Sequence, residues 1–218
     1  MNSNKLLKAL SWLYFKLIFM MSVFYFYVIG KGKVFGESNL PSTNNYILAL
    51  NHVSYLDWLL VYAYFKFNKH IDTRFVAKEK LFSHPAWKWV MVESKSIMAP
   101  ERPSIDAYKK FICEVNEANT VLGIFPEGTR TADGLIAEAK TGVISIAVGL
   151  QRPIVPVALS GFYEAWSRER LLPKLFNCNL TITFGEPIII DHTKQDVDRS
   201  ESAKVIMQAI NNLMNKNT

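Results

Sequence analysis

Two side chains that could share a proton, His52 and Asp57, follow an apolar stretch of the chain and stand five positions apart. Histidine is the usual general base near neutral pH, and a carboxylate on its other ring nitrogen would fix the tautomer that accepts a proton. On one continuous helix the two side chains would point about 140° apart. They can meet only if His52 lies in a turn before a helix, so the spacing alone also allows a loop histidine beside a helix-capping aspartate.

A second polar segment, residues 125–130 with the sequence Phe-Pro-Glu-Gly-Thr-Arg, follows another apolar stretch. Pro126 would end a strand because it cannot donate a ladder hydrogen bond. Gly128 would permit a tight turn and the close approach of a ligand, and the planar guanidinium of Arg130 suits a phosphate group. Taken alone, this segment indicates either an anion site or an ordinary polar turn.

Taken together, the two segments resemble the lysophospholipid acyltransferase family, which includes the 1-acylglycerol-3-phosphate acyltransferases. That family carries an NHxSxxD block and an FPEGTR block, and the matching positions here are Asn51, His52, Ser54, Asp57 and residues 125–130. The family's final block is matched by Lys140, Thr141, Gly142, Ala147, Pro153 and residues 155–158. Arg102 stands where the second block of the family ends in arginine, although residues 96–101 depart from the rest of that block. The resemblance covers about residues 32–161 and is specific because the blocks follow in order.

The resemblance implies direct transfer of a fatty acyl group from a thioester donor to a hydroxyl. His52 would take the proton from the acceptor hydroxyl, and Asp57 would orient the imidazole and stabilise its charged form. The acceptor would be a lysophospholipid, most readily 1-acylglycerol-3-phosphate giving phosphatidic acid, and the donor acyl-CoA or acyl-carrier protein. The residues expected to bind substrate are Arg102, Glu127, Gly128, Thr129, Arg130 and Lys140. No metal, and no cofactor besides the acyl donor, is implied.

Alternating strands and helices are expected to position these residues. Short apolar runs predict strands at residues 46–50, 74–77, 121–125, 154–159 and 180–184. Helical patterns cover residues 58–67, 104–116, 141–150 and 200–214, with Ser104 as an N-cap. This order predicts an α/β domain at residues 32–218, with a mixed, largely parallel sheet flanked by helices. Active sites of such sheets lie at strand ends, where both polar segments fall.

The N-terminal segment is unusually apolar, since Ser22 is the one residue from Leu17 to Ile29 that is neither apolar nor aromatic. As a helix this run would span about 20 Å, which is short of the roughly 30 Å bilayer core. Lys5, Lys8 and Lys16 would share an arc of about 80°. We therefore expect residues 1–31 to form a membrane-associated helix in the bilayer interface, with a single span or a packed core helix as alternatives.

Composition narrows the class of protein. The chain has 218 residues, 50% of them hydrophobic, and a net charge of +6 from 25 Lys+Arg and 19 Asp+Glu. This mild basic excess fits anionic lipid or phosphorylated substrates. Outside the N-terminus the sequence has no sustained basic stripe with interleaved aromatics that would indicate nucleic acid. Cys113 and Cys178 form no CxxC pair, which predicts two buried, reduced thiols. We expect a membrane-associated protein whose active site faces the cytoplasm.

Two other classes of protein remain as alternatives. A metal-dependent hydrolase could use His52, Asp57 and Glu127 as ligands, although the motifs contain a single histidine and no His-rich ligand spacing. A catalytically inactive, lipid-binding module on the same fold is disfavoured by the intact pair of His52 and Asp57. An acyltransferase for a different lyso-lipid acceptor also stays open.

Overall fold

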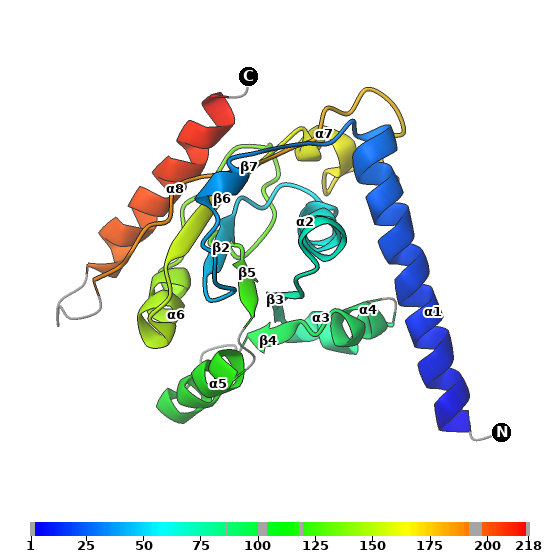
Figure 1. The fold of residues 1–218 in the computed structure, drawn as a ribbon, viewed down its shortest axis with the longest axis horizontal. Coiled ribbons are helices and arrows are strands. Elements are labelled where there is room, and N and C mark those ends of the chain that lie inside the picture. The colour runs from blue at the N-terminus through cyan, green and yellow to red at the C-terminus, as the bar shows by residue number, and fades with distance from the viewer. Residues whose placement is uncertain (1–2, 86, 100–103, 118–119, 192–197, 217–218) are drawn as a thin grey trace.

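The sheet at the centre of the molecule is mixed and largely parallel, as the sequence predicts (Figure 1). The computed structural model describes residues 3–85, 87–99, 104–117, 120–191 and 198–216. In these residues seven strands pair in the order β1-β7-β6-β2-β5-β3-β4. They are β1 (Lys33–Phe35), β2 (Ile47–Leu50), β3 (Thr73–Lys78), β4 (Ile97–Ala99), β5 (Val121–Ile124), β6 (Ile154–Ser160) and β7 (Thr181–Phe184). Strand β7 runs antiparallel to β6, and the other neighbouring pairs are parallel.

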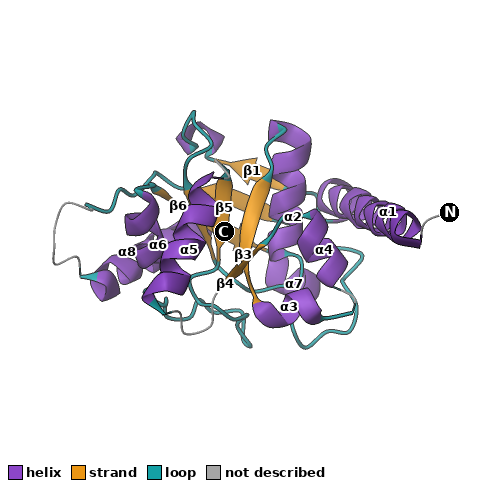
Figure 2. Cartoon of the chain, turned by 90° about the horizontal axis from the view of Figure 1, so that it is seen from below, coloured by secondary structure: helices purple, strands orange, loops and turns teal. Residues whose placement is uncertain are grey.

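Helices cover both faces of this sheet (Figure 2). They are α1 (Ser3–Phe24), α2 (Asp57–Tyr64), α3 (Glu79–Ser83), α4 (Lys88–Glu93), α5 (Ile105–Glu117), α6 (Gly142–Leu150), α7 (Phe162–Trp166) and α8 (Arg199–Asn215). Three shorter helical turns are η1 (Tyr25–Ile29), η2 (Glu37–Asn39) and η3 (Phe65–Lys69). Helix α2 packs on one face together with α1, whereas α5, α6 and α8 pack on the other.

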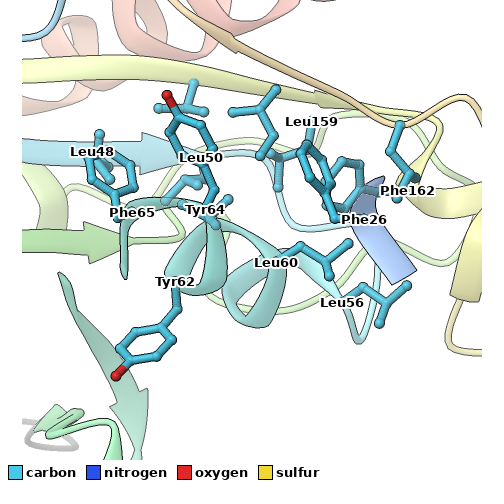
Figure 3. Close-up of a cluster of buried hydrophobic side chains, with 14 of the residues drawn as sticks. Phe26, Leu48, Leu50, Leu56, Leu60, Tyr62, Tyr64, Phe65, Leu159 and Phe162 are labelled. Carbon is cyan, nitrogen blue, oxygen red and sulfur yellow. The ribbon is translucent and has the colours of Figure 1, made fainter. Parts of the chain in front are cut away.

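Strand β2 shows why the sequence folds into a covered sheet. Its four residues are fully buried, as expected for a parallel strand with helices on both faces. Leu48 and Leu50 point into the core beneath α2, near Leu60 and Phe65 (Figure 3). The alternate residues of β2 enter the core under α6 and α8. The continuous apolar run thus fixes β2 at the centre, and the residues after it emerge at the sheet's carboxyl edge.

The predicted elements are confirmed with small shifts at their ends. Ser104 does cap α5, since its Oγ accepts a hydrogen bond from the amide of Ala107 at 3.2 Å. The sequence did not indicate β1 and β4, which have three residues each, because so short a run has no measurable period. The expectation of two buried thiols is wrong for Cys113, which is exposed on α5, and right for Cys178.

Helix α1 turns most of its large apolar side chains outward. Its inner face contacts the rest of the chain through Ser11, which donates to Glu93 at 3.0 Å, and through Phe15 and Phe19 against the ring of Tyr62. Residues Lys5–Ile29 form a helical segment long and apolar enough to cross a membrane, by length and composition alone, and 11% of its most apolar window is buried. This exposure is unlike that of a core helix. The helical segment is also longer than the apolar run from Leu17 to Ile29 that was recognised in the sequence.

Candidate active site

The turn between β2 and α2 brings His52 and Asp57 together. Strand β2 ends at Leu50, and α2 begins at Asp57. The intervening turn lets the Asp57 carboxylate fold back, so that its Oδ2 lies 2.8 Å from Nδ1 of His52. The same oxygen accepts hydrogen bonds from the amides of Val53 at 2.7 Å and Ser54 at 2.8 Å. His52 therefore precedes the helix, as the spacing of the pair requires.

The electrostatics of Asp57 reflect two opposing effects. Its side chain is fully buried, and this burial raises the pKa of the carboxyl above the ordinary value. The hydrogen bonds from His52, Ser54 and Val53 act in the opposite direction, because they favour the ionised form. With Nδ1 of His52 donating to this carboxylate, Nε2 is left as the acceptor. The His52 side chain is 19% exposed, so a substrate can reach it.

The backbone of His52 is held by the segment that follows β5. Its amide donates to Oε1 of Glu127 at 2.7 Å, and its carbonyl accepts from the amide of Thr131 at 2.9 Å. The other Glu127 oxygen, Oε2, accepts from the amide of Ala137 at 3.0 Å. The His52 ring also stacks on Phe125 with centroids 4.0 Å apart. Two segments distant in sequence thereby fix one imidazole.

Glu127 consequently lies behind His52 rather than in the cavity wall. It is 3% exposed, and burial raises the pKa of its carboxyl against the effect of the two amide hydrogen bonds. The family resemblance implies that Glu127 binds substrate, and that role remains a prediction. The contacts indicate a positioning role for this carboxylate, because both oxygens are engaged with backbone amides.

A cavity of about 350 Å³ opens beside the His52 ring. Four of the predicted substrate-binding residues line it, namely Gly128, Thr129, Arg130 and Lys140. Much of the remaining wall is apolar, with contributions from Trp58, Phe75, Leu81, Met91, Ile124, Val143 and Ile146. The cavity thus joins a cationic edge to an apolar interior, next to a candidate base. Arg102 lies outside the described residues.

Gly128 shapes the cationic edge of this cavity. Its φ of +68° lies in the left-handed region that favours glycine. A Cβ there would approach the Nζ of Lys140 to 3.2 Å, so the lysine side chain passes directly over the glycine. Lys140 is also tied to this turn by its amide, which donates to the carbonyl of Pro126 at 2.9 Å.

Sequence reasoning missed several residues that bear on the site. The Arg130 guanidinium lies 3.6 Å above the ring of Tyr55, and that ring contacts Trp166 at 5.3 Å between centroids. Tyr55 also lines a smaller cavity of about 120 Å³ that shares His52 and Arg130 with the larger one. An aromatic residue inside the histidine motif was the available signal for Tyr55.

Two lysines that are not among the predicted site residues add positive charge to the wall of the larger cavity. Lys78 is the last residue of β3, and Lys80 follows in α3. Strand β3 runs parallel to β5, so Lys78 lies at the same sheet edge as the segment after β5. Their position after a predicted strand was the signal that could have identified them.

Asn51 is a further residue whose contacts the sequence could not predict. Its buried side chain pairs with the backbone of Leu159, donating to the carbonyl at 3.1 Å and accepting from the amide at 2.8 Å. This contact fixes the end of β2 against β6. Within the described part of the chain, no group of three or more His, Cys, Asp or Glu side chains could hold a metal ion.

Comparison with known proteins identifies relatives by sequence. A family model described as Acyltransferase matches residues 31–160. A 1-acyl-sn-glycerol-3-phosphate acyltransferase from Cocos nucifera is 28% identical over 164 residues, which cover 73% of this chain and 51% of the relative. The protein of the same name from Bacillus subtilis (strain 168) is 31% identical over 137 residues, covering 61% of this chain and 64% of the relative. The chain thus spans about half to two thirds of the length of these two relatives.

A solved structure shares the fold. The 1-acyl-sn-glycerophosphate (LPA) acyltransferase PlsC from Thermotoga maritima superposes with a TM-score of 0.72, covering 100% of this chain and 83% of that one. The two sequences are 22% identical, so this likeness shows the architecture alone. It agrees with the sheet and the N-terminal helix described above.

Proposed function

This chain belongs to the Acyltransferase family, and from that premise we propose that it moves a fatty acyl group from a thioester donor to the free hydroxyl of a lysophospholipid. The observation that carries the proposal is the contact of 2.8 Å between His52 and the buried Asp57, beside a cavity with a cationic edge and an apolar interior. The cationic edge suits a phosphate, and the apolar interior suits an acyl chain.

In the proposed mechanism His52 acts as general base. Its Nε2 takes the proton from the acceptor hydroxyl while the hydroxyl oxygen attacks the thioester carbonyl carbon. The carbon–sulfur bond then breaks, and the imidazolium returns the proton to the departing thiolate. Asp57 holds Nδ1 throughout and stabilises the charged ring. The family resemblance gives Ser54 no role as a nucleophile. The Ser54 Oγ donates a hydrogen bond to the carbonyl of Trp166 at 2.8 Å.

The acceptor we propose is 1-acylglycerol-3-phosphate, which would give phosphatidic acid. The activity for which the two relatives are named supports this choice, and so does the position of Arg130 and Lys140 on the cavity wall. A guanidinium and an ammonium offer charge-assisted hydrogen bonds to phosphate oxygens. Arg102 would join them, and Gly128 and Thr129 would border the glycerol. Either acyl-CoA or acyl-carrier protein would serve as donor, with no metal and no further cofactor.

We further propose that the protein works at a membrane, with its active site facing the cytoplasm. The outward apolar face of α1 supports the contact with a membrane, since Leu13, Leu17 and Met20 are 57–65% exposed there. A lyso-lipid could then enter the site while its chain stays in the bilayer.

The proposal is tested with purified full-length protein, labelled acyl-CoA or acyl-carrier protein, and a panel of lyso-lipids whose products are read by mass spectrometry. We expect phosphatidic acid from 1-acylglycerol-3-phosphate, and activity that survives dialysis against a strong chelator. If the protein acylates a different lyso-lipid and not 1-acylglycerol-3-phosphate, the proposed acceptor is wrong. Release of free fatty acid without transfer, or activity restored by zinc after chelation, would favour a hydrolase.

A further inference from the structure

The loop between α7 and β7 exposes an unusual cluster of large apolar side chains. Leu171 is 90% exposed, Leu172 71%, Leu175 55% and Phe176 74%. Single exposed apolar residues are common on soluble proteins, but a contiguous group is typical of an interaction site. We call residues 168–176 the apolar loop. This loop lies outside the sequence motifs and does not line either cavity described above.

The base of the apolar loop is fixed by hydrogen bonds, so its apolar side chains are held outward by an ordered backbone. The amide of Lys174 donates to the carbonyl of Ala165 at 2.7 Å, and the hydroxyl of Tyr25 donates to the carbonyl of Lys174 at 2.6 Å. The indole of Trp166 donates to the carbonyl of Arg170 at 3.1 Å. These contacts join the loop to α7 and to the turn η1 that follows α1.

The charges of the loop match an anionic surface. Arg168, Arg170 and Lys174 stand beside the apolar side chains, against one acidic residue, Glu169. Basic residues that flank exposed leucine and phenylalanine fit the interface of a bilayer, where the apolar groups enter the acyl region and the cations meet lipid phosphates.

The loop also adjoins the two parts of the molecule that bear on membrane lipid. Figure 1 shows it curving beside the C-terminal end of α1. At its other side, the carbonyl of Trp166 accepts from the amide of Tyr55 at 3.2 Å, and the two rings are in contact. Tyr55 in turn lies under Arg130. Lipid contact at the loop would therefore hold the cationic edge of the site close to the bilayer surface.

From these observations we infer that the apolar loop inserts Leu171, Leu172, Leu175 and Phe176 into the interface of an anionic bilayer, as a membrane contact separate from α1. The benefit to catalysis rests on the proposed function, because it assumes an acceptor drawn from the membrane. The insertion itself does not, and it can be measured without turnover.

An environment-sensitive fluorophore at Leu172→Cys tests the insertion directly. The full-length chain would carry Cys113→Ser to remove the exposed thiol, while Cys178 is buried and 1% exposed. With vesicles containing phosphatidylglycerol we expect a blue shift and quenching by a nitroxide lipid. The matched control is Ile189→Cys, which is 79% exposed and apolar but lies after β7, next to Ile188, which pairs with Ile154 of β6. Two results would overturn the inference. In one, aqueous iodide still quenches the label at position 172 when the protein is bound to vesicles. In the other, the label is already shielded from iodide when no vesicles are present.

A second measurement compares two double variants. Leu171→Ser with Leu172→Ser should lower the partition coefficient onto anionic vesicles about tenfold, and Ile105→Ser with Ile189→Ser should leave it unchanged, although these isoleucines are 75% and 79% exposed. Equal partitioning of both variants would contradict the loop's role. Transfer to a monomeric short-chain acceptor is measured in parallel. Absence of loop insertion in protein with the wild-type loop, with that transfer intact, rejects this inference alone, whereas insertion without transfer to any lyso-lipid rejects the proposed function alone.

Discussion

The imidazole of His52 is positioned through both its ring and its backbone. Asp57 contacts Nδ1 at 2.8 Å, while Glu127 and Thr131 bind the main-chain amide and carbonyl. A base that is fixed in tautomer and in position loses little entropy when the substrate arrives. The contact of the ring with Asp57 and the backbone contacts with Glu127 and Thr131 can therefore be tested separately.

Replacing the base should remove transfer without unfolding the protein. His52→Ala is expected to lower kcat by about 10²- to 10⁴-fold, the usual contribution of a general base. Asp57→Asn should be comparably damaging, because the amide cannot select the same imidazole tautomer. Circular dichroism and thermal unfolding would verify that both variants fold. Turnover at the wild-type rate by folded His52→Ala protein would exclude the mechanism.

The pH dependence of transfer should show an acid limb set by the buried carboxyls. Burial raises the pKa of Asp57 and of Glu127, so both take up protons at a higher pH than an exposed carboxyl would. As the pH falls, protonation of Asp57 removes the carboxylate that holds Nδ1 of His52, and activity should decline before the pH reaches about 4, the ordinary carboxyl value. The profile of kcat/KM against pH measures this limb. A flat profile in protein that stays folded would contradict the assignment.

Tyr55 should affect acceptor binding through Arg130. Arg130→Ala removes charge-assisted hydrogen bonds worth about 1.5–3 kcal/mol, which corresponds to about a 10- to 100-fold rise in acceptor KM. Tyr55→Leu removes the ring under the guanidinium, a contact worth about 0.5–2 kcal/mol, and should raise the same KM less. Tyr55→Phe keeps the ring and serves as the matched control. A rise in donor KM with unchanged acceptor KM would instead place Arg130 at the donor.

At the scale of elements, the site depends on the carboxyl ends of neighbouring parallel strands. Strand β2 lies between β5 and β6, and β3 pairs with β5. His52 follows β2, residues 125–131 follow β5, and Lys78 ends β3. Parallel neighbours deliver these segments to one edge of the sheet, where short turns can bond to each other. Glu127 joins the turns after β2 and β5.

The contact between these turns can be tested at Glu127. In Glu127→Gln the backbone amide of either His52 or Ala137 would face the side-chain NH₂ group, which cannot accept a hydrogen bond. One buried hydrogen bond is then lost, at a cost of about 1–3 kcal/mol of stability. If Glu127 positions His52, kcat should fall while acceptor KM changes little. Glu138→Gln, an exposed carboxyl nearby, is the control. A higher acceptor KM with unchanged kcat would show that Glu127 binds substrate.

Across the whole molecule, α1 presents an apolar surface beside α2 and α4. Deleting the segment to residue 29 would be a poor test of membrane binding, because Tyr25 and Phe26 are 8% and 1% exposed and belong to the core. The outward positions Leu10, Leu13 and Leu17 are 53–59% exposed and can be changed without removing inner contacts.

We therefore predict that Leu10→Gln, Leu13→Gln and Leu17→Gln together shift the protein towards the soluble fraction, since less apolar area enters the bilayer. Transfer to bilayer-presented acceptor should fall more than transfer to a short-chain acceptor dispersed as monomers. Vesicle flotation and both assays measure this. Equal flotation of variant and wild type would place the membrane contact elsewhere. Cysteines near Lys5 and Lys31 labelled from opposite sides of the membrane would show a span instead of an interfacial helix.

The longer strands and helices, and the grouping of most of the candidate site, could be predicted from the sequence. Apolar runs such as Ile47–Leu50 and Val121–Ile124 predict buried strands because burial on both faces leaves a direct mark in composition. The polar segments were recognised because each one directly follows such an apolar run in the sequence. His52, Gly128, Thr129, Arg130 and Lys140 indeed line one cavity, although their roles in catalysis stay predictions.

Only the tertiary structure decided which distant groups meet. Glu127 reaches the amide of His52 across 75 positions of sequence, and Tyr55 lies under Arg130 because β2 and β5 are neighbours. Strand order and loop closure fix such partners, and neither leaves a periodic signal in the chain. The exposure of Leu171 and Phe176 is likewise a property of the folded surface, because residue type records hydrophobicity but the packing of the whole chain decides what remains uncovered.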